Sequence, residues 1–268
     1  MKYSIIVPFY SHPIDSVLAV AEGRNDTEVI ISLTGEKELN SQSSMLIIVQ
    51  CRGCGYGEAV NRAVEISRGD VLIVMNDDII LENDFIDKID VLDFDILIPH
   101  VIDIKSGNTE SYYAVLNSFW YSKLRTKISN KDDKYIPGSI FAVKREIFMK
   151  SGMFDKDYFM YYEDIDLSKR IKKTAKVSLA PEIKAFHKHS FSDGGMKRYY
   201  LQRNRLLMIL KNCASWMLIP FVLYAMTFEN LIMVVQIVRQ KNLLPLKARY
   251  DFFRMFPKFF RKRHENTR

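Results

Sequence analysis

Cysteine is scarce in this sequence. The 268 residues include three, Cys51, Cys54 and Cys213. So sparse and odd a set does not form the disulfide framework of a small secreted domain, and we therefore expect a reducing compartment. Cys51 and Cys54 form a lone CxxC pair with no second pair nearby, which only weakly indicates a zinc or redox site. We interpret both as small loop residues.

The N-terminus has no long apolar run. In MKYSIIVPFYSHP the run has about five residues before Pro8, shorter than the roughly 7–15 residues at the centre of a signal peptide. We therefore expect no signal peptide and predict a buried strand here.

Acidic residues are scarce at the C-terminus. From Arg239 onward there are ten Lys/Arg and two Asp/Glu, a balance of +8, whereas the whole chain carries +7. The rest of the chain therefore sums to −1. This distribution argues against nucleic acid as a partner and favours a local contact with an anionic surface.

The first hundred residues alternate apolar runs with polar stretches that have helical spacing. Continuous Ile/Val-rich runs are typical of strands covered on both faces, and their alternation with helices predicts an α/β fold with a mainly parallel sheet. The predicted strands are 3–9, 28–33, 45–50, 70–75 and 94–101. The predicted helices lie within 12–23, 55–69 and 82–92.

The alternation ends near Val101. Residues 103–135 show no clear period, and we expect an excursion or flexible loop. Further on, 176–190 is predicted as a strand, a turn at Pro181 and a second extended segment, and 196–212 as a helix.

A long apolar stretch follows the last of these helices. Residues 212–228 carry no charge, and a second apolar run continues to Val238. A spanning helix needs about 20 apolar residues, and Pro220 and Glu229 interrupt this one. Two helices lying in the membrane interface fit better, because 249–263 interleaves Phe with Arg and Lys. The alternative is that 213–238 covers the core.

Asn76, Asp77 and Asp78 follow a predicted buried strand, the place from which such sheets present groups to ligands. Adjacent carboxylates are costly there unless a cation or hydrogen bonds compensate, and a divalent metal ion bound to phosphate oxygens would do so. The structural alternative is a polar turn that caps the next helix.

The stretch QCRGCGYGEAVNRA, 50–63, looks like a phosphate-binding glycine loop. It fails the dinucleotide fingerprint, because Glu58 or Val60 stands where the third glycine belongs, and it has no GK[ST]. Its glycines still allow a ligand to approach the backbone closely.

Two histidines, His187 and His189, alternate on a predicted extended segment. They should point to opposite sides, so one of them is expected to face a site. A lone histidine is more often structural than a ligand, but beside an aspartate pair a neutral imidazole could complete a metal site.

The segment YYEDIDLSKR, 161–170, crowds three carboxylates. Asp166 and Arg170 are four residues apart and can pair on a helix. Glu163 and Asp164 fall in the first helical turn, where the helix dipole favours negative charge. Capping explains one of these two acids. Both together, after two tyrosines, suggest a base beside aromatic walls for a sugar.

In this order, the segments resemble the inverting family-two glycosyltransferases with the GT-A fold, and most of all the rhamnosyltransferase-like branch. The matching segments are SIIVPFYS, GYGEAVNRAVEISRGDVLIVMNDD, PGSIFAVKREIF, GMFDKDYFMYYEDIDLSKRI, PEIKAFHKHS and YYLQRNRLLMILKN. The resemblance implies a GT-A catalytic domain over 1–212, followed by an apolar and basic helical extension over 213–268.

The resemblance also implies roles for single residues. It implies a nucleotide-sugar donor with Mn²⁺ or Mg²⁺, held by Asp78 and His187 with His189 as the fallback. Asp164 would be the general base of a single displacement, and Glu163 would orient the acceptor. The donor-side positions would be Pro8, Tyr10, Asn61, Asn76, Asp77 and Gly138. The segment VIISLTG, 29–35, lacks the acidic residue that relatives carry after the second strand, so donor contacts are expected to differ.

The main interpretation is an inverting transferase, peripheral on the inner face of the cell membrane, that acts on a saccharide or lipid-linked saccharide. The sequence leaves open whether the chain forms a homo-oligomer. One alternative is a non-catalytic transferase-like subunit, which the altered VIISLTG favours slightly. The other is a nucleotidyltransferase, but such enzymes carry a glycine-rich basic loop where this chain has PFYSHPID.

Overall fold

The computed structural model describes residues 1–36, 45–189 and 194–265. The chain divides into two compact units, Met1–Ser190 and Phe191–Arg268. This division falls at Ser190, whereas the sequence places the domain boundary at 212. The difference is one helix, α6 (Gly194–Asn212), which packs along α9 (Leu244–Glu265) within the second unit.

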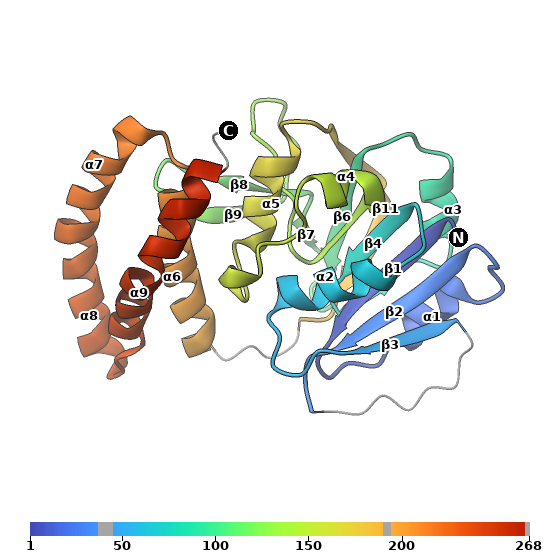
Figure 1. Cartoon of the computed structure of the whole chain (residues 1–268). Helices are drawn as coiled ribbons and strands as arrows, with labels where there is room; N and C mark the ends of the chain where they lie inside the picture. The colour runs from blue at the N-terminus through green and yellow to red at the C-terminus, as the bar shows by residue number, and fades with distance from the viewer. Residues whose placement is uncertain (37–44, 190–193, 266–268) are drawn as a thin grey trace. The chain divides into compact units, whose positions relative to one another are not determined.

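The first unit is built on a mixed sheet with the order β3-β2-β1-β4-β10-β6-β11-β5 (Figure 1). Its first four strands are parallel, β10 is antiparallel to both neighbours, and β11 is parallel to β6. The predicted α/β class with a mainly parallel sheet is confirmed, because the strands of this order run in one direction except β10 and β5, which run against it. The strands are β1 (Tyr3–Phe9), β2 (Thr27–Leu33), β3 (Leu46–Gln50), β4 (Val71–Met75), β5 (Ile79–Leu81), β6 (Ile96–Asp103), β10 (Ile140–Lys144) and β11 (Val177–His187).

Both faces of this sheet are covered, as continuous apolar strands require. Along β1, Ile5 and Val7 belong to one core cluster, shared with helices α1 and α3, whereas Ile6 belongs to the other, shared with α2, α4 and α5. The helices are α1 (Asp15–Ala21), α2 (Tyr56–Ile66), α3 (Phe85–Asp90), α4 (Arg145–Lys150) and α5 (Glu163–Ile171).

The excursion predicted over 103–135 is not an irregular loop. It contains β7 (Thr109–Ser111), which pairs with β6, and a hairpin of β8 (Tyr113–Leu116) and β9 (Ser122–Arg125). Hydrophobic periodicity does not reveal these strands because they are short and because the residues that hold them in place are distant in sequence. The fully buried Tyr113, for example, donates a hydrogen bond from its hydroxyl to Asp132 at 2.9 Å.

The predicted turn at Pro181 is also wrong. β11 is one strand of 11 residues whose register against β6 shifts between Ala180 and Lys184. Because proline has no N–H to give to the ladder, a local irregularity accommodates it without ending the strand. The strand therefore continues to His187, which lies opposite Ile79 of β5.

The second unit is helical. In the part of the chain that the structure describes, no single helix is long and apolar enough to cross a membrane, although Ser215–Tyr224 and Thr227–Arg239 would qualify together as a pair bent by 40°. A π-helical turn, η2 (Ala225–Glu229), joins α7 (Ser215–Tyr224) to α8 (Asn230–Gln240). Within it, the buried Glu229 pairs with Arg205 and Arg249, which explains one acidic residue in an apolar run.

Candidate active site

The end of strand β4 brings the predicted metal ligands together. Asp78 is 6% exposed, and its Oδ1 lies 3.2 Å from Nε2 of His187. The sheet causes this meeting, because Asp78 directly precedes β5 and β5 pairs with the end of β11. Asp78 also accepts a backbone hydrogen bond from Lys188 at 2.9 Å.

The other ring nitrogen of His187 meets a carboxylate that the sequence did not indicate. Nδ1 lies 2.8 Å from Oε2 of Glu110 on β7. Burial alone would lower the pKa of His187, but the hydrogen bonds and charges of Asp78 and Glu110 outweigh it and raise that pKa to about 9. Without a bound cation, this imidazole therefore carries a proton at neutral pH.

The two histidines do not point to opposite sides, contrary to expectation. The ring centroids of His187 and His189 are 4.0 Å apart, and Nε2 of His189 is 3.2 Å from Oε2 of Glu110. The strand ends at His187, and His189 has a left-handed backbone with φ of 49°, so strand alternation does not extend to it.

Glu163 and Asp164 open helix α5. Burial, and next the charge of Asp164, raise the pKa of Glu163 well above its ordinary value. Asp164 is partly exposed, and burial raises its pKa to about 6 against the opposing effect of backbone amides such as Ile165. Two neighbouring carboxyl groups with raised pKa values can share one proton, so that one can serve as an acid and the other as a base.

Gly138 and Tyr56 link this pair to the metal-ligand side. A side chain at Gly138 would have its Cβ 2.9 Å from Oδ2 of Asp164, so only glycine leaves room for that carboxylate. Tyr56 donates a hydrogen bond from its hydroxyl to Gly138 O at 3.0 Å. Burial, followed by the charges of Glu163, Asp164 and Asp78, raises the pKa of Tyr56. One tyrosine therefore lies close to all three acids, and its only sequence signal was its place in the glycine-rich stretch.

Two glycines of that stretch, Gly55 and Gly57, face the protein chain and not open space. A Cβ on Gly55 would lie 2.2 Å from Phe159 O, and a Cβ on Gly57 2.9 Å from Cβ of Phe154. The glycines therefore let helix α2 pack against the chain that leads into α5. Cys51 and Cys54 are joined by a disulfide, whereas we expected two small loop residues; a turn that bonds Cys54 N to Cys51 O at 2.9 Å brings them together.

The two tyrosines before α5 differ in exposure. Tyr161 is half-buried, but Tyr162 is 4% exposed, and its hydroxyl donates to Trp120 O at 2.9 Å. Tyr162 is therefore not an open wall for a sugar but a tie to the β8–β9 hairpin. Both residues, and Phe159, have positive φ between 66° and 74°. Such conformations are strained in residues other than glycine and cluster at functional sites.

The donor-side positions have well-defined neighbours. Pro8 lies in β1 beyond the last residue that pairs with β4, so its missing N–H costs no ladder bond. Tyr10 is 69% exposed, and its backbone amide is bound by Asp77. Asn61 holds the backbone of Phe154 through both amide atoms, at 2.8 and 3.0 Å. Asn76 donates its backbone N–H to Ser139 O at 2.9 Å, next to Gly138.

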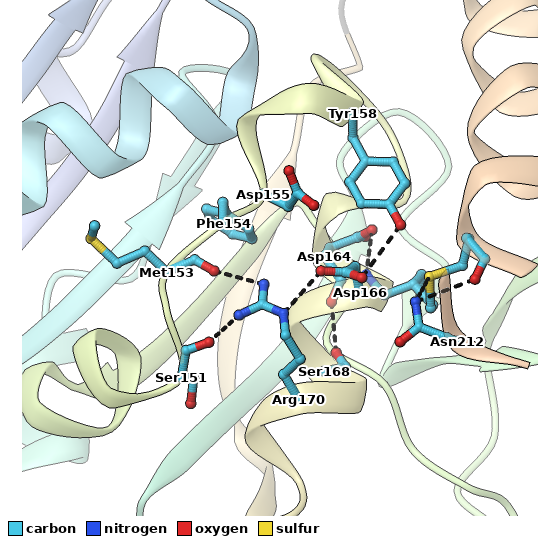
Figure 2. Close-up of polar contacts among 12 residues, drawn as sticks. Ser151, Met153, Phe154, Asp155, Tyr158, Asp164, Asp166, Ser168, Arg170 and Asn212 are labelled. Atoms are coloured by element: carbon cyan, nitrogen blue, oxygen red, sulfur yellow. Dashed lines mark hydrogen bonds and ion pairs between the residues drawn. The ribbon is translucent and has the colours of Figure 1, made fainter. Parts of the chain in front are cut away.

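The predicted pair of Asp166 and Arg170 is confirmed. Nε of Arg170 lies 2.9 Å from Oδ2 of the fully buried Asp166 (Figure 2). The same guanidinium donates to the carbonyls of Ser151 and Met153, so it ties α5 to the turn after α4 (Figure 2). Asp166 is therefore a structural residue.

A polar hollow of about 500 Å³ lies along the β8–β9 hairpin. Its charged lining residues are Lys123, Arg125, Lys131, Asp132 and Asp133. Two lining residues of the hollow contact the ends of α5: Ser122 donates its backbone N–H to the hydroxyl of Tyr162 at 3.4 Å, and Asp133 pairs with Lys172.

The donor atoms suit a hard divalent ion. Asp78 offers a buried carboxylate beside an imidazole, and the ligand atoms of Glu110, His187 and His189 lie within 4.8 Å of one another. Carboxylate oxygen suits Mn²⁺ and Mg²⁺, and neutral imidazole nitrogen is a common metal ligand, so the two kinds of atom together can hold a divalent ion.

Comparison with known families decides the broad identity. A model described as glycosyl transferase family 2 matches residues 4–152, more than half of the chain. The chain belongs to glycosyl transferase family 2. The match includes Asp78 and Gly138 but ends before Glu163, Asp164 and His187.

Relatives of this family-2 glycosyltransferase match in part. An N-acetylglucosaminyl-diphospho-decaprenol L-rhamnosyltransferase from two strains of Mycobacterium tuberculosis is 34% identical over 91 residues, 31% of this chain and 30% of the relative. The aligned region thus covers less than a third of that protein.

Two solved structures share the fold. Staphylococcus aureus TarS 1–349 in complex with UDP-GlcNAc has a TM-score of 0.55 at 14% identity, over 80% of this chain and 68% of TarS. The Pyrobaculum calidifontis mannosyltransferase PcManGT, in complex with GDP-Man and Mn²⁺, has a TM-score of 0.54 at 12% identity, over 99% and 85%. These similarities confirm the GT-A fold.

Proposed function

We propose that this family-2 glycosyltransferase moves a sugar from a nucleotide-diphosphate donor to a hydroxyl of a saccharide or lipid-linked saccharide, with inversion. The observation that carries this proposal is the acid pair of α5. Asp164 is a partly exposed carboxylate with a pKa near 6. It lies beside Glu163, whose pKa is raised well above its ordinary value, and near Tyr56, whose pKa the charge of Asp78 also raises.

Asp164 would act as the base. A pKa just below neutral keeps the carboxylate charged at pH 7 while leaving it basic enough to take the proton of an acceptor hydroxyl. That oxygen attacks the anomeric carbon as the bond to the diphosphate breaks, so a single displacement inverts the centre. An α-linked donor then gives a β-product, and a β-linked donor such as dTDP-L-rhamnose gives an α-product. General base catalysis supplies on the order of 10²–10⁴ in rate.

Glu163 would orient the acceptor. The raised pKa of Glu163 favours its protonated carboxyl group, which can donate a hydrogen bond to an acceptor oxygen. Within the described part of the chain, its buried Oε2 has no hydrogen-bond partner. A buried polar atom without a partner is costly unless a ligand pairs with it.

Asp78 and His187 would hold a divalent ion at the end of β4. Bound there, Mn²⁺ or Mg²⁺ would neutralise the charge of the leaving diphosphate. PcManGT, which shares the fold, is in complex with Mn²⁺ and a nucleotide sugar, and this supports the assignment.

We propose a lipid-linked acceptor and, as the first donor to test, dTDP-L-rhamnose. The partial relative is by name a rhamnosyltransferase acting on a diphospho-decaprenol, which supports both choices. The charged hollow at the β8–β9 hairpin, fastened to the region of the acid pair, is where we place the acceptor side.

We also propose that the second unit rests on the inner face of the cell membrane. On α9 the exposed Leu246, Tyr250, Phe253 and Phe260 recur at helical spacing, a stripe typical of interfacial helices. Lys258 and Arg261 are exposed on the same helix, where they can meet lipid phosphates. The long exposed apolar side chains of α7 to α8 are Trp216, Ile219, Val222, Leu223, Phe228, Leu231, Ile232, Val234, Val235 and Val238.

The test is a panel of nucleotide sugars. Thermal unfolding with Mn²⁺ and each donor should single out one nucleotide sugar that raises the unfolding temperature. The selected donor is then incubated with polyprenyl-diphosphate saccharides, and the anomeric configuration of the product is read by NMR. We expect an inverted product. Binding without hydrolysis or transfer would favour a non-catalytic subunit, and retention would contradict the single displacement.

A further inference from the structure

His187 lies between two carboxylates, one at each ring nitrogen. Nε2 is 3.2 Å from Oδ1 of Asp78, and Nδ1 is 2.8 Å from Oε2 of Glu110. A neutral imidazole has one nitrogen that carries a proton and one with a free lone pair. Only the second can bind a metal ion, so the two carboxylates cannot have the same role.

We propose that Glu110 is a positioning residue: it accepts the Nδ1–H of His187 and so directs the Nε2 lone pair towards Asp78 and a divalent ion. This rests on the proposed function, in which Asp78 and His187 hold that ion. A carboxylate on the second nitrogen fixes both the tautomer and the ring orientation of a metal-binding histidine.

The fold holds Glu110 in this place. Its strand β7 pairs with β6 through Val101 and Ile102, and β6 in turn pairs with the end of β11. The two strands that carry Glu110 and His187 are therefore joined by one common neighbour. The side chains are 14% and 11% exposed respectively, so water competes little for their hydrogen bond.

The competing arrangement makes Glu110 a direct ligand together with His189. Its Oε2 is 3.2 Å from Nε2 of His189, and the ligand atoms of Glu110, His187 and His189 would fit around one ion. Glu110 meets His187 at Nδ1, so an ion bound by both through that nitrogen would leave Asp78 at the opposite nitrogen, Nε2. His189 is also 43% exposed, whereas Asp78 lies buried at the end of the central strands.

The experiment measures the binding of Mn²⁺ to the full-length protein without donor or acceptor. Electron paramagnetic resonance counts free Mn²⁺ during the titration, and electron spin echo modulation detects a nitrogen ligand at saturation. Loss of such a second carboxylate typically costs about 10–100-fold in metal affinity. We expect E110A to weaken Mn²⁺ binding by this factor while keeping the nitrogen signal of His187.

Three further variants separate the outcomes. D103N removes a charge that also interacts with His189 but accepts hydrogen bonds from Lys105 and Ser106, so it controls for charge alone. H189A tests the competing arrangement, and both should change the affinity less than threefold. E110Q keeps an oxygen that can accept from Nδ1–H, so it should bind Mn²⁺ more tightly than E110A.

Several results would overturn the inference. Unchanged Mn²⁺ affinity in E110A removes the role of Glu110. Equal losses in E110A and H189A make Glu110 a direct ligand, and an equal loss in D103N reduces the effect to charge. If H187A binds Mn²⁺ as tightly as the wild type, Asp78 and His187 are not the ligand set, and the inference about Glu110 fails with it. Because E110A leaves both proposed ligands in place, failure of the inference alone can be distinguished from failure of the ligand set. Thermal unfolding of each variant shows whether it is folded.

Discussion

The carboxylate of Asp77 holds the backbone amide of Tyr10 with a hydrogen bond of 2.9 Å from N to Oδ2. The same oxygen accepts the amides of Ser11 at 2.9 Å and His12 at 3.1 Å. Three successive N–H groups of the loop after β1 thus converge on one side chain from the end of β4. Asp77 therefore shapes the loop that carries the exposed Tyr10, which we propose as a donor-binding residue.

Replacing Asp77 should weaken nucleotide binding without touching a metal ligand. Hydrogen bonds to a charged group contribute about 1.5–3 kcal/mol each, so D77A should release the loop. We expect roughly a tenfold loss of affinity for UDP or dTDP, equal to about 1.4 kcal/mol. Isothermal titration measures it, with D84A, an exposed acid of the same region, as control. Equal affinities in D77A and wild type would show that the loop is held without Asp77.

Glu163 should tolerate glutamine better than alanine. Its raised pKa favours the protonated carboxyl group, and E163Q replaces that group with an amide that is also neutral and donates hydrogen bonds. We expect E163Q to retain most donor binding and to raise the acceptor KM, whereas E163A should lose transfer by at least about a further order of magnitude. Steady-state kinetics with varied acceptor distinguishes the two. Equal and complete loss in both variants would mean that Glu163 acts as a charged carboxylate.

The transfer rate should depend on pH through Asp164. Its pKa is raised from 3.8 to about 6, and a base works only when deprotonated, so kcat/KM should fall tenfold per unit below pH 6 and be flat above. The measurement uses saturating Mn²⁺, so that any pH dependence of metal binding does not contribute to the pH profile of kcat/KM. The groups that face Asp164 are Glu163 and Tyr56, and burial raises the pKa of each well above its ordinary value. A profile flat down to pH 5 would remove Asp164 as the base.

Membrane binding should depend on two kinds of residue in the second unit. Replacing Trp216 and Leu223 by Glu puts charges into the apolar surface, and should abolish flotation with anionic vesicles at any salt concentration. Replacing Lys258 and Arg261 by Glu should weaken flotation mainly at low salt, where surface charges are least screened. The exposed Lys105 of the first unit, changed to Glu, is the control. If both double variants float with the vesicles as fully as the wild type, membrane binding through this unit is contradicted.

Much of the first unit follows from local patterns. Continuous apolar runs correctly predicted five strands of the central sheet. The four-residue spacing of Asp166 and Arg170 predicted an ion pair, which the structure confirms. The resemblance to a family pointed to both Asp78 and His187, and sheet pairing brings them to 3.2 Å.

What could not be predicted depends on contacts between distant segments. Glu110 lies in a stretch without hydrophobic period, and only the pairing of β7 with β6 places it at His187. The burial of Tyr162 comes from a hairpin some 40 residues earlier in the chain. Gly55, just before α2, is needed because the backbone of Phe159 passes close to it. Such a close approach between two backbones leaves no periodic pattern in the sequence, so it could not be predicted.

The most direct test of the central claim is transfer by D164N in a single turnover. In the wild type, Oδ1 of Asp164 accepts a hydrogen bond from the backbone N–H of Ile165 at 2.8 Å. The side-chain oxygen of asparagine can accept the same bond but cannot take a proton from the acceptor. Because Asp164 binds its proton more tightly when folded, its charge lowers the free energy of unfolding as pH rises from about 4 to 6, so D164N should be no less stable at pH 7. With enzyme in excess over labelled donor, we predict transfer at least about 10² slower than wild type with nucleotide affinity unchanged. Transfer at the wild-type rate would contradict Asp164 as the base and the mechanism built on it.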